Sequence, residues 1–597
     1  PRGWGEKGVA EGGSAHGDVL PAASFRRPGF PPTDRVREHQ PRPGSQTVVE
    51  QPIFGPMKTI SEVAKALDLD PSQLEPYGHW KAKISLKSFM NRPQRGKLVL
   101  VSAITPTPAG EGKTTTSVGL AQGLAKIGVK SAVALREPSL GPTFGMKGGG
   151  AGGGASEIVP VDDINMHFNG DFHAVSSAHN LLAALVDNAL HHDNAHGLDP
   201  RRTVWKRVVD MNDRALRDIV IGLGGRTEGI PRETGFDITA ASEVMAVLCL
   251  ADGINDLKAR LGRIVVGYRS DSTPVTAADL NAVGAMAALL RDAIKPNLVQ
   301  TTEGVPAFVH GGPFANIAHG TNTIAATKAA LAYADIVITE AGFAFELGAE
   351  KFFDINCRYG GFAPACTVLV TTIRALKMHG GVPVADVNKP DVGAMVRGFS
   401  NMEKHLENIK KFEQPCVVAI NHFPSDTKEE VETLKLHCEA LGLQAVVSKG
   451  FVDGGKGCIE LAEVVRDLVA KSTPHFRPLY EWNDTIENKI RIVAREMYGA
   501  QAVDYTVRAK RDRIQLEKLG FDKLPICIAK TQQSLSDNPA LLGRPKDFLV
   551  TVREIQLAAG AGFIIPITGE IMRMPGLPKE PLAGKFDLSE DGEIVKK

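Results

Sequence analysis

The stretch Ile104-Thr-Pro-Thr-Pro-Ala-Gly-Glu-Gly-Lys-Thr-Thr-Thr-Ser117 decides the fold that this chain is expected to adopt. An apolar, β-branched run, Lys97-Leu-Val-Leu-Val-Ser-Ala103, comes before it. A segment with helical periodicity, Val118-Gly-Leu-Ala-Gln-Gly-Leu-Ala125, follows it. A strand, a glycine-rich turn and a helix in this order are typical of a phosphate-binding loop. The sequence therefore predicts a nucleoside triphosphate site.

Individual residues of the turn fit this role. Gly110 and Gly112 let backbone N–H groups approach phosphate oxygens, Lys113 is expected to reach the β- and γ-phosphates, and Thr114 to help hold Mg²⁺. The match is incomplete, because Thr107 stands where the common motif has its first glycine. A surface turn of this composition is the alternative. The expected nucleotide-binding set is Thr105, Pro106, Thr107, Pro108, Ala109, Gly110, Glu111, Gly112, Lys113 and Thr114.

The whole composition is that of a globular protein with several domains. The chain has 597 residues, 43% of them hydrophobic, and a net charge of +1. This charge gives no reason to expect binding to nucleic acid or to a membrane surface. No apolar run approaches the roughly 20 residues that a membrane-spanning helix needs. Seven cysteines without a CxxC pair indicate reduced thiols, a cytoplasmic location and no structural zinc.

Residues 1–56 differ from the rest in being rich in Gly, Pro and Arg, without hydrophobic periodicity. Disorder is expected there. The segment is too acidic for a good transit peptide and has no apolar core for a secretory signal. A non-native extension, with Met57 as the natural start, is an equally good explanation.

After the turn, β-branched runs alternate with amphipathic segments, which indicates an α/β fold with parallel strands. We expect a P-loop NTPase-like parallel sheet domain and two smaller α/β domains, with limits at residues 57–325, 326–470 and 471–597. Helices are expected at Asp199–Arg217, Asp279–Ile294 and Asp484–Tyr498. The expected strands are Ser131–Leu135, Arg263–Tyr268, Ala334–Thr339, Thr367–Thr371, Cys416–Ile420, Gln444–Ser448, Pro525–Ala529 and Phe548–Val552.

Several polar groups follow predicted strands, where ligands of parallel sheets bind. Arg136 ends the second strand and could clamp a small carboxylate or an acyl phosphate with two parallel hydrogen bonds. Glu137 could orient a nucleophile or a metal-bound water; a surface Arg–Glu pair is the alternative. Asp171, from an acidic and histidine-containing cluster, is a candidate for Mg²⁺ binding or acid–base chemistry.

Aromatic residues follow later strands. Phe423 and Phe451 lie in predicted loops, where a planar heterocycle could stack between them, although core packing is the commoner role of a single Phe. Phe343, in Glu340-Ala-Gly-Phe343, could line the same cleft. His310-Gly-Gly-Pro313 and the glycine-rich Lys147–Gly154 are further loops, for which a simple turn and a flexible linker are the alternatives.

Taken together, these motifs resemble those of formate–tetrahydrofolate ligases, from about Met57 to the C-terminus, in the bacterial form that carries this single function. The stretches that carry the resemblance are Thr105–Thr116, Arg136-Glu-Pro-Ser-Leu-Gly-Pro142, Arg232-Glu-Thr-Gly-Phe-Asp237, Phe314-Ala-Asn-Ile-Ala-His-Gly320, Arg374-Ala-Leu-Lys-Met-His-Gly380 and Met574-Pro-Gly-Leu-Pro578.

The resemblance implies that ATP phosphorylates formate and that N10 of tetrahydrofolate then attacks the formyl phosphate. It assigns ATP phosphates to Lys113 and formate to Arg136, with Glu137 and Asp171 as acid–base and positioning candidates. Phe423 and Phe451 would sandwich the pterin. The family further implies a homotetramer and activation by K⁺ or NH₄⁺.

The sequence departs from the family at a few positions. Phe451 replaces the usual Trp, which predicts weaker folate binding, and Ala344-Phe345-Glu346 stands where the family tends to have small residues and an Asp. Two other functions remain as alternatives. One is a kinase or ligase that forms an acyl phosphate from another small carboxylate. The other is a non-enzymatic protein whose binding to a partner is switched by ATP.

Overall fold

The computed structural model describes residues 57–108, 110–147 and 150–596. The described residues belong to one compact unit, Ile53–Lys597. The prediction for residues 1–56 and the assignment of Ala109 to the nucleotide site lie outside the described residues.

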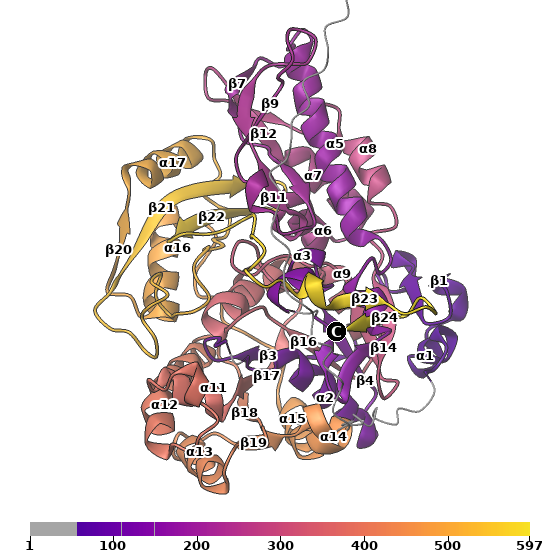
Figure 1. The fold of residues 1–597 in the computed structure, drawn as a ribbon, viewed down its shortest axis with the longest axis vertical. Coiled ribbons are helices and arrows are strands. Elements are labelled where there is room, and N and C mark those ends of the chain that lie inside the picture. Colours follow the sequence, from indigo (N-terminus) through magenta and orange to yellow (C-terminus); the bar gives the residue numbers. More distant parts are fainter. Residues whose placement is uncertain (1–56, 109, 148–149, 597) are drawn as a thin grey trace, which may run out of the picture. The chain divides into compact units, whose positions relative to one another are not determined.

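A large, mainly parallel sheet of 12 strands forms the centre of the described part, and the chain has an α/β fold as predicted (Figure 1). Its strand order is β1-β2-β14-β15-β4-β16-β3-β17-β18-β19, and neighbouring strands from β15 to β19 are parallel. The strands are β1 Leu74–Tyr77, β2 Lys81–Ile84, β14 Asn297–Thr301, β15 Pro306–Val309, β4 Ser131–Leu135, β16 Ile336–Glu340, β3 Lys97–Ala103, β17 Pro364–Thr371, β18 Cys416–Asn421 and β19 Ala445–Ser448, with β6 Ser156–Val159 beside β14 and β5 Gly152–Gly153 beside β6.

Alternate side chains of the parallel strands belong to two hydrophobic clusters, one on each face of this sheet. Val99 and Val101 of β3 pack into one hydrophobic cluster with α2 (Lys113–Lys126) and α15 (Ile459–Lys471). Leu98 and Leu100 pack into the other cluster, with α9 (Ile324–Tyr333). Successive side chains of a strand point to opposite faces, so an unbroken apolar run is what a strand covered on both faces requires. The helix after the phosphate loop is thereby fixed against the sheet.

Smaller elements surround the central sheet; Figure 1 shows the long α5 with α7 and α8 near the small sheet of β7, β12 and β13. The remaining strands are β7 Leu198–Thr203, β8 Arg207–Val209, β9 Ile219–Ile221, β10 Arg232–Thr234, β11 Phe236–Ile238, β12 Val265–Arg269, β13 Pro274–Thr276, β20 Ala502–Tyr505, β21 Leu549–Ala558, β22 Phe563–Thr568, β23 Phe586–Leu588 and β24 Ile594–Lys596. The remaining helices are α1 Ile60–Ala66, α3 Leu140–Pro142, α4 Val161–Asn165, α5 Asp171–His191, α6 Glu243–Leu250, α7 Ile254–Arg263, α8 Val283–Leu289, α10 Arg358–Gly360, α11 Ile373–His379, α12 Val392–Lys411, α13 Lys428–Ala440, α14 Gly450–Asp453, α16 Ile486–Val493 and α17 Val507–Lys518.

Most predicted strands of the parallel sheet are confirmed, whereas the segments next to it contain errors. The helix predicted at Asp199–Arg217 is wrong, because this segment forms β7, β8 and a short 3₁₀ turn. The helix predicted at Asp279–Ile294 is confirmed only over α8. The run Arg263–Tyr268 is a strand, but as β12 it belongs to a small antiparallel sheet. Pro525–Ala529 makes only isolated bridges to β22, at Ile526 and Ala529.

The central sheet takes strands from both sides of residue 325. β15 and β16 come from either side of that position, and only β4 separates them in the sheet. The predicted limit at residue 325 therefore lies inside the sequence span of one sheet. The division of the chain into three domains stays a prediction.

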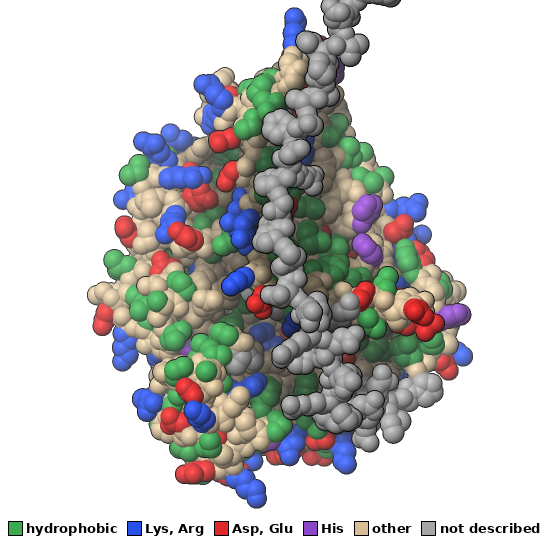
Figure 2. Space-filling view, in the orientation of Figure 1, with side chains coloured by type: hydrophobic (Ala, Val, Ile, Leu, Met, Phe, Trp, Pro, Cys, Tyr) green, Lys and Arg blue, Asp and Glu red, His purple; other side chains and the backbone are tan. Residues whose placement is uncertain are grey.

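The surface carries both signs of charge. Figure 2 shows Lys and Arg side chains interspersed with Asp and Glu over the coloured part of the face in view. A large field of one sign, as nucleic acid binding needs, is not seen on that part of the face. Among the described residues, no helix has the length and apolar character needed to cross a membrane. All seven cysteines are free thiols.

Candidate functional site

The phosphate loop connects β3 to α2 at the carboxyl end of the parallel strands. Gly110 and Gly112 both have φ of 74°, in the left-handed region, and Gly112 directly precedes the first residue of α2, Lys113. Thr107 donates its backbone N–H and its hydroxyl to Glu111 Oε1, at 2.6 and 3.1 Å. Thr107, which replaces the usual glycine, thus joins two parts of the loop through hydrogen bonds to Glu111. The first α2 N–H groups remain available to an anion.

Asn421, the last residue of β18, contacts this loop from the second strand beyond β3, with β17 between them. Its Nδ2 donates to the backbone oxygen of Glu111 at 3.0 Å, and it lies so close to Gly112 that a Cβ there would overlap Nδ2. Glycine is therefore needed at position 112 for two reasons: its φ is positive, and Asn421 leaves no room for a Cβ.

We predict that Gly112→Ala weakens the binding of ADP by at least tenfold, measured by calorimetry. The left-handed conformation costs a non-glycine residue about 1–2 kcal/mol, and the overlap with Asn421 adds to this cost. Gly128→Ala is the matched control. Gly128 follows α2 and has φ of 81°, and a Cβ at this position would have no described atom within 4 Å. It should lower stability without changing affinity. Equal affinities for ADP in both variants would contradict the prediction.

Thr114 and Glu340 form the part of the site that fits a divalent cation. The Thr114 hydroxyl donates to the Glu340 carboxylate, with 3.0 Å to Oε2 and 3.2 Å to Oε1. Glu340 ends β16, the strand next to β3. A hydroxyl and a carboxylate are oxygen ligands of the kind Mg²⁺ takes beside nucleotide phosphates. No group of three or more His, Cys, Asp or Glu suited to a metal occurs in the described residues, so nucleotide oxygens would complete such a site.

Lys113 lies among charges of both signs. Burial lowers the pKa of Lys113, the carboxylates of Glu111 and Glu340 raise it, and Arg136 lowers it. The structure thus brings together three of the predicted residues, Lys113, Glu111 and Arg136. It adds Glu340, which the sequence analysis named only within a stretch that could line the cleft. An acidic residue at the end of a strand neighbouring the phosphate loop is the signal that identifies it.

Arg136 follows β4 and points toward the same region. Its Nη1 donates to the backbone oxygen of Pro313 at 3.2 Å, while its buried Nε has no acceptor among the described residues. Burial lowers the pKa of Arg136, and the Glu340 carboxylate raises it. Gly342 is also close: a Cβ there would come 3.1 Å from Nη1. The predicted loop at His310-Gly-Gly-Pro313 is therefore part of the wall around this guanidinium.

Glu137, the residue after Arg136, lies beside Asp171 in a buried cluster. Lys83 Nζ is 2.7 Å from Asp171 Oδ1, and Asn297 Nδ2 donates to Asp171 Oδ2 at 2.8 Å. Burial, and then the Asp171 carboxylate, raise the pKa of Glu137 well above its ordinary value, while Lys83 opposes this. His310 Nε2 is 3.8 Å from Asp171 Oδ2, and burial lowers the pKa of His310 to about 4. Burial thus disfavours the charged forms of both Glu137 and His310.

The sequence did not indicate two members of this cluster, Lys83 and Asn297. Lys83 lies on β2, an antiparallel strand that four other strands separate from β3 in the sheet, and nothing in its local pattern marks it. Its ion pair holds Asp171 at the start of α5, which makes Asp171 a buried, paired carboxylate rather than a free base.

The three aromatic candidates lie beyond the ends of β16, β18 and β19. Phe423 is covered by the Arg374 guanidinium, 3.4 Å from its ring centroid. Phe451 is 53% exposed and packs against Gly153 and Gly154 of the glycine-rich loop. Phe343 has φ of 59°, an uncommon conformation for a bulky residue that is often found at functional sites. No ring contact joins these three residues in the described structure, so a sandwich of Phe423 and Phe451 stays a prediction.

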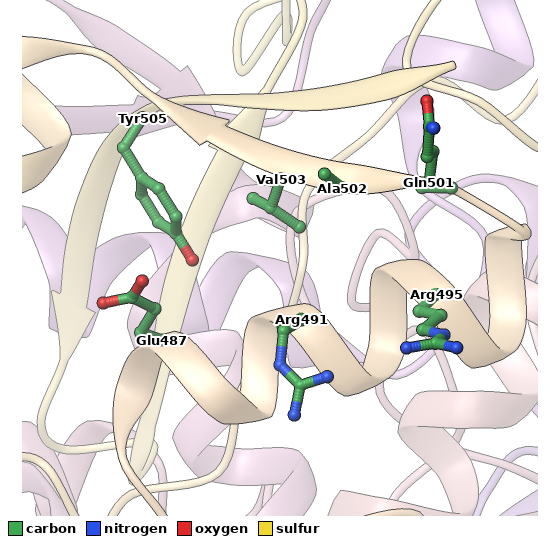
Figure 3. Close-up of a pocket in the computed structure, with 8 residues that line it drawn as sticks. Glu487, Arg491, Arg495, Gln501, Ala502, Val503 and Tyr505 are labelled. Carbon is green, nitrogen blue, oxygen red and sulfur yellow. The ribbon is translucent and has the colours of Figure 1, made fainter. Parts of the chain in front are cut away.

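Two cavities lie away from this constellation. One, of about 170 Å³, lies between α16 and β20 and is lined by Glu487, Arg491, Arg495 and Tyr505 among others (Figure 3). The other, of about 670 Å³, is lined by residues of α6, α17, β21 and the segment around Trp205. Neither lining contains a residue of the predicted site.

A protein-family model described as formate–tetrahydrofolate ligase matches residues 50–596 of this chain. The match spans the phosphate loop, Arg136, Glu137, Asp171 and the three aromatic candidates, and nearly the whole sequence.

Proposed function

Because the chain belongs to the formate–tetrahydrofolate ligase family, we propose that it joins formate to tetrahydrofolate through a formyl phosphate intermediate, with ATP as phosphoryl donor. At the family level the activity is that of an ATP-dependent ligase that uses formate and tetrahydrofolate. The intermediate, the residues and the cations are the parts that we propose here.

One observation carries the proposal: the candidate groups follow three consecutive strands of the sheet. The phosphate loop follows β3, Glu340 ends β16, and Arg136 follows β4, in the spatial order β3-β16-β4. Carboxyl ends of adjacent parallel strands meet at one edge of a sheet. A phosphate site, an oxygen ligand set for a cation and an unsatisfied guanidinium are thereby adjacent.

In the first step, a formate oxygen attacks the γ-phosphorus of ATP, and the bond from this phosphorus to the β-phosphate oxygen breaks. ADP leaves and formyl phosphate remains. Arg136 suits the binding of formate because its buried Nε still lacks an acceptor among the described residues. Two N–H groups of one guanidinium can hold both oxygens of a carboxylate. As the bond breaks, negative charge moves toward ADP. Lys113 would neutralise this charge on the phosphate oxygens.

In the second step, N10 of tetrahydrofolate attacks the formyl carbon, phosphate leaves, and N10 loses its proton. Formate itself is a poor acceptor, whereas an acyl phosphate carries a good leaving group. We assign folate contacts to Phe343, Phe423 and Phe451. Of these, Phe451 is the most open to a planar ligand, since 53% of it is exposed. Glu137 and Asp171 are proposed to position the reacting groups from the buried cluster with Lys83.

Thr114 and Glu340 would hold Mg²⁺, which when bound with ATP offsets the charge of the β- and γ-phosphates. We also propose, from family membership, activation by K⁺ or NH₄⁺ and a homotetrameric assembly. A cytoplasmic location is proposed as well, and the seven unpaired thiols are consistent with it.

We predict that Glu340→Gln raises the Mg²⁺ concentration needed for half-maximal activity by about tenfold, the lower end of the range for altered metal-site partners. An amide keeps the size of the side chain and loses the charge that attracts the cation. A titration of activity with MgCl₂ at saturating substrates measures this effect, and excess Mg²⁺ should restore much of the rate. An unchanged Mg²⁺ requirement would remove Glu340 from the proposed ligand set.

The proposed function is tested by ADP production from purified protein, with ATP, Mg²⁺, formate and tetrahydrofolate omitted one at a time. The expected result is turnover that needs all of them and gives 10-formyltetrahydrofolate. ATP hydrolysis that ignores formate and folate would overturn the proposal and favour an ATP-switched binding protein. Turnover with acetate in place of formate would favour a ligase for another carboxylate.

A further inference from the structure

The first residue of the phosphate loop, Thr105, is held by three buried side chains from α11 and α12. His379 Nε2 lies 2.9 Å from the Thr105 backbone oxygen, and Asn401 Oδ1 accepts the Thr105 N–H at 3.3 Å. The Thr105 hydroxyl lies 3.0 Å from Asn401 Nδ2 and 3.1 Å from His405 Nε2. Thr105 is 1% exposed, and Asn401 and His405 are fully buried. The entry to the loop is thus fixed by side chains rather than by solvent.

The directions of these hydrogen bonds can be worked out from the backbone. Thr105 N–H can only donate, so the atom of Asn401 that faces it is the oxygen. Asn401 Nδ2 must then donate, to the Thr105 hydroxyl and to the backbone oxygen of Gly543 at 2.7 Å. The direction of the contact between the Thr105 hydroxyl and His405 Nε2 depends on the tautomer of His405, and the surroundings of Nδ1 select that tautomer.

A neutral imidazole that accepts at Nε2 carries its hydrogen on Nδ1. Burial keeps His405 neutral, because it lowers the pKa of this side chain well below its ordinary value. His405 Nδ1 faces Glu346 Oε2 at 3.7 Å, and neither atom has another partner among the described residues. A carboxylate oxygen is what an N–H at that position requires. The opposite tautomer would place two lone pairs face to face.

From this geometry we propose that Glu346 is a positioning residue for the nucleotide: through His405 it fixes the tautomer that holds the Thr105 hydroxyl and the entry of the phosphate loop. The inference rests on the proposed ATP site. In the described residues no hydrogen bond or ion pair joins Glu346 to the loop, although its charge raises the pKa of Lys113. It lies in a buried π-helical segment, Phe345–Ala349, that follows β16 and Glu340 along the chain.

Lys530 holds the other oxygen of Glu346 and connects this network to the C-terminal part of the chain. Its Nζ is 3.4 Å from Glu346 Oε1 and also donates to the backbone oxygens of Thr531 and Ser534. Glu346, His405 and Lys530 are all fully buried. The carboxylate is thus held from one side by an ammonium and oriented toward the imidazole on the other.

The first experiment measures the affinity of Glu346→Gln for ADP with Mg²⁺ by calorimetry, without formate or folate. The expected result is about a tenfold loss of affinity, the lower limit seen when a side chain that orients a contacting residue is altered. Glu350→Gln is the matched control, because Glu350 lies directly after the same buried segment and has no hydrogen bond to His405 or Thr105 in the described structure. It should bind ADP as the unmodified protein does. Equal affinities of Glu346→Gln and the unmodified protein overturn the proposal.

A double-mutant cycle separates action through His405 from general loosening. After His405→Phe, the further change Glu346→Gln should alter ADP affinity by less than about twofold, because the path to Thr105 is already broken. Independent, additive losses contradict the proposal. Because the readout is nucleotide binding, this result does not depend on formate-dependent turnover. The proposed function can fail while the network is confirmed, or the reverse.

The unmodified protein provides a test that requires no tolerated substitution at Glu346. In a ¹⁵N spectrum of histidine-labelled protein, His405 should show the neutral Nδ1–H form and His379 the neutral Nε2–H form. The spectrum of His405→Phe, or of His405→Gln if the Phe variant does not fold, assigns the signal. An Nε2–H form at His405 overturns the proposal.

Discussion

Replacement of Arg136 with alanine should lower the rate of formate-dependent ADP production by about 10³-fold or more, the range seen when a charge that stabilises acyl or phosphoryl transfer is removed. The structure places this guanidinium after β4, fixed at Nη1 by the Pro313 oxygen and open at the buried Nε. Alanine removes the group that would bind formate and then neutralise formyl phosphate. The loss should appear in kcat as well as in the KM for formate.

Arg136→Lys separates the charge from its geometry. Lysine keeps the charge but cannot form two parallel hydrogen bonds, so the loss should remain about 10²-fold or more. Affinity for ADP, measured by calorimetry, should stay within about threefold in both variants, which would indicate that the phosphate loop is intact. Retention of more than a tenth of the rate by Arg136→Ala would contradict the assignment of formate to this residue.

Replacement of Lys113 with methionine is expected to lower kcat/KM for ATP by roughly 10²- to 10³-fold, since a positive charge beside the transferred phosphoryl group is lost. Methionine keeps most of the length of the side chain. Burial lowers the pKa of Lys113, and the carboxylates of Glu111 and Glu340 oppose this shift.

Lys126→Met is the matched control for this variant. Lys126 lies at the other end of α2 and forms a partly exposed ion pair with Glu303, at 2.9 Å. Such a pair contributes about 0–1 kcal/mol, so kcat/KM for ATP should be unchanged. Steady-state kinetics with varied ATP compare the two. Similar losses in both variants would show that the effect is on the helix rather than on phosphate binding.

The parallel strands could be predicted because their signal is local. β3 and β4 have the predicted bounds, Lys97–Ala103 and Ser131–Leu135. Strands that are buried on both faces consist of unbroken runs of apolar, often β-branched residues, which are visible in the sequence. The phosphate loop could be found for the same reason, from a strand, glycines and a helix in direct succession. The placement of Arg136 near this loop was predicted from its position at a strand end, and its role stays a prediction.

The errors occur where structure depends on distant partners. Leu198–Thr203 pairs with β12, and Arg207–Val209 pairs with β11, both remote in sequence. Their charged, irregular pattern suggested a helix because intrinsic propensity is a weak guide when pairing decides the outcome. The same reason explains why Lys83 was not predicted in the site. Its role depends on an ion pair with Asp171, and the spacing of residues in the sequence does not reveal such a contact.

The strand order of the central sheet has a consequence for synthesis on the ribosome. β3, which carries the phosphate loop, lies between β16 and β17, residues 336–340 and 364–371, and the loop is braced by Asn421. The nascent chain therefore makes β3 long before its neighbours emerge, and closing such distant contacts is slow. ATP at the proposed site could not stabilise the early part of the chain, because Glu340 and Asn421 are translated only later. A ribosome-bound chain that ends before residue 364 should leave an edge of β3 exposed, as a substrate for chaperones.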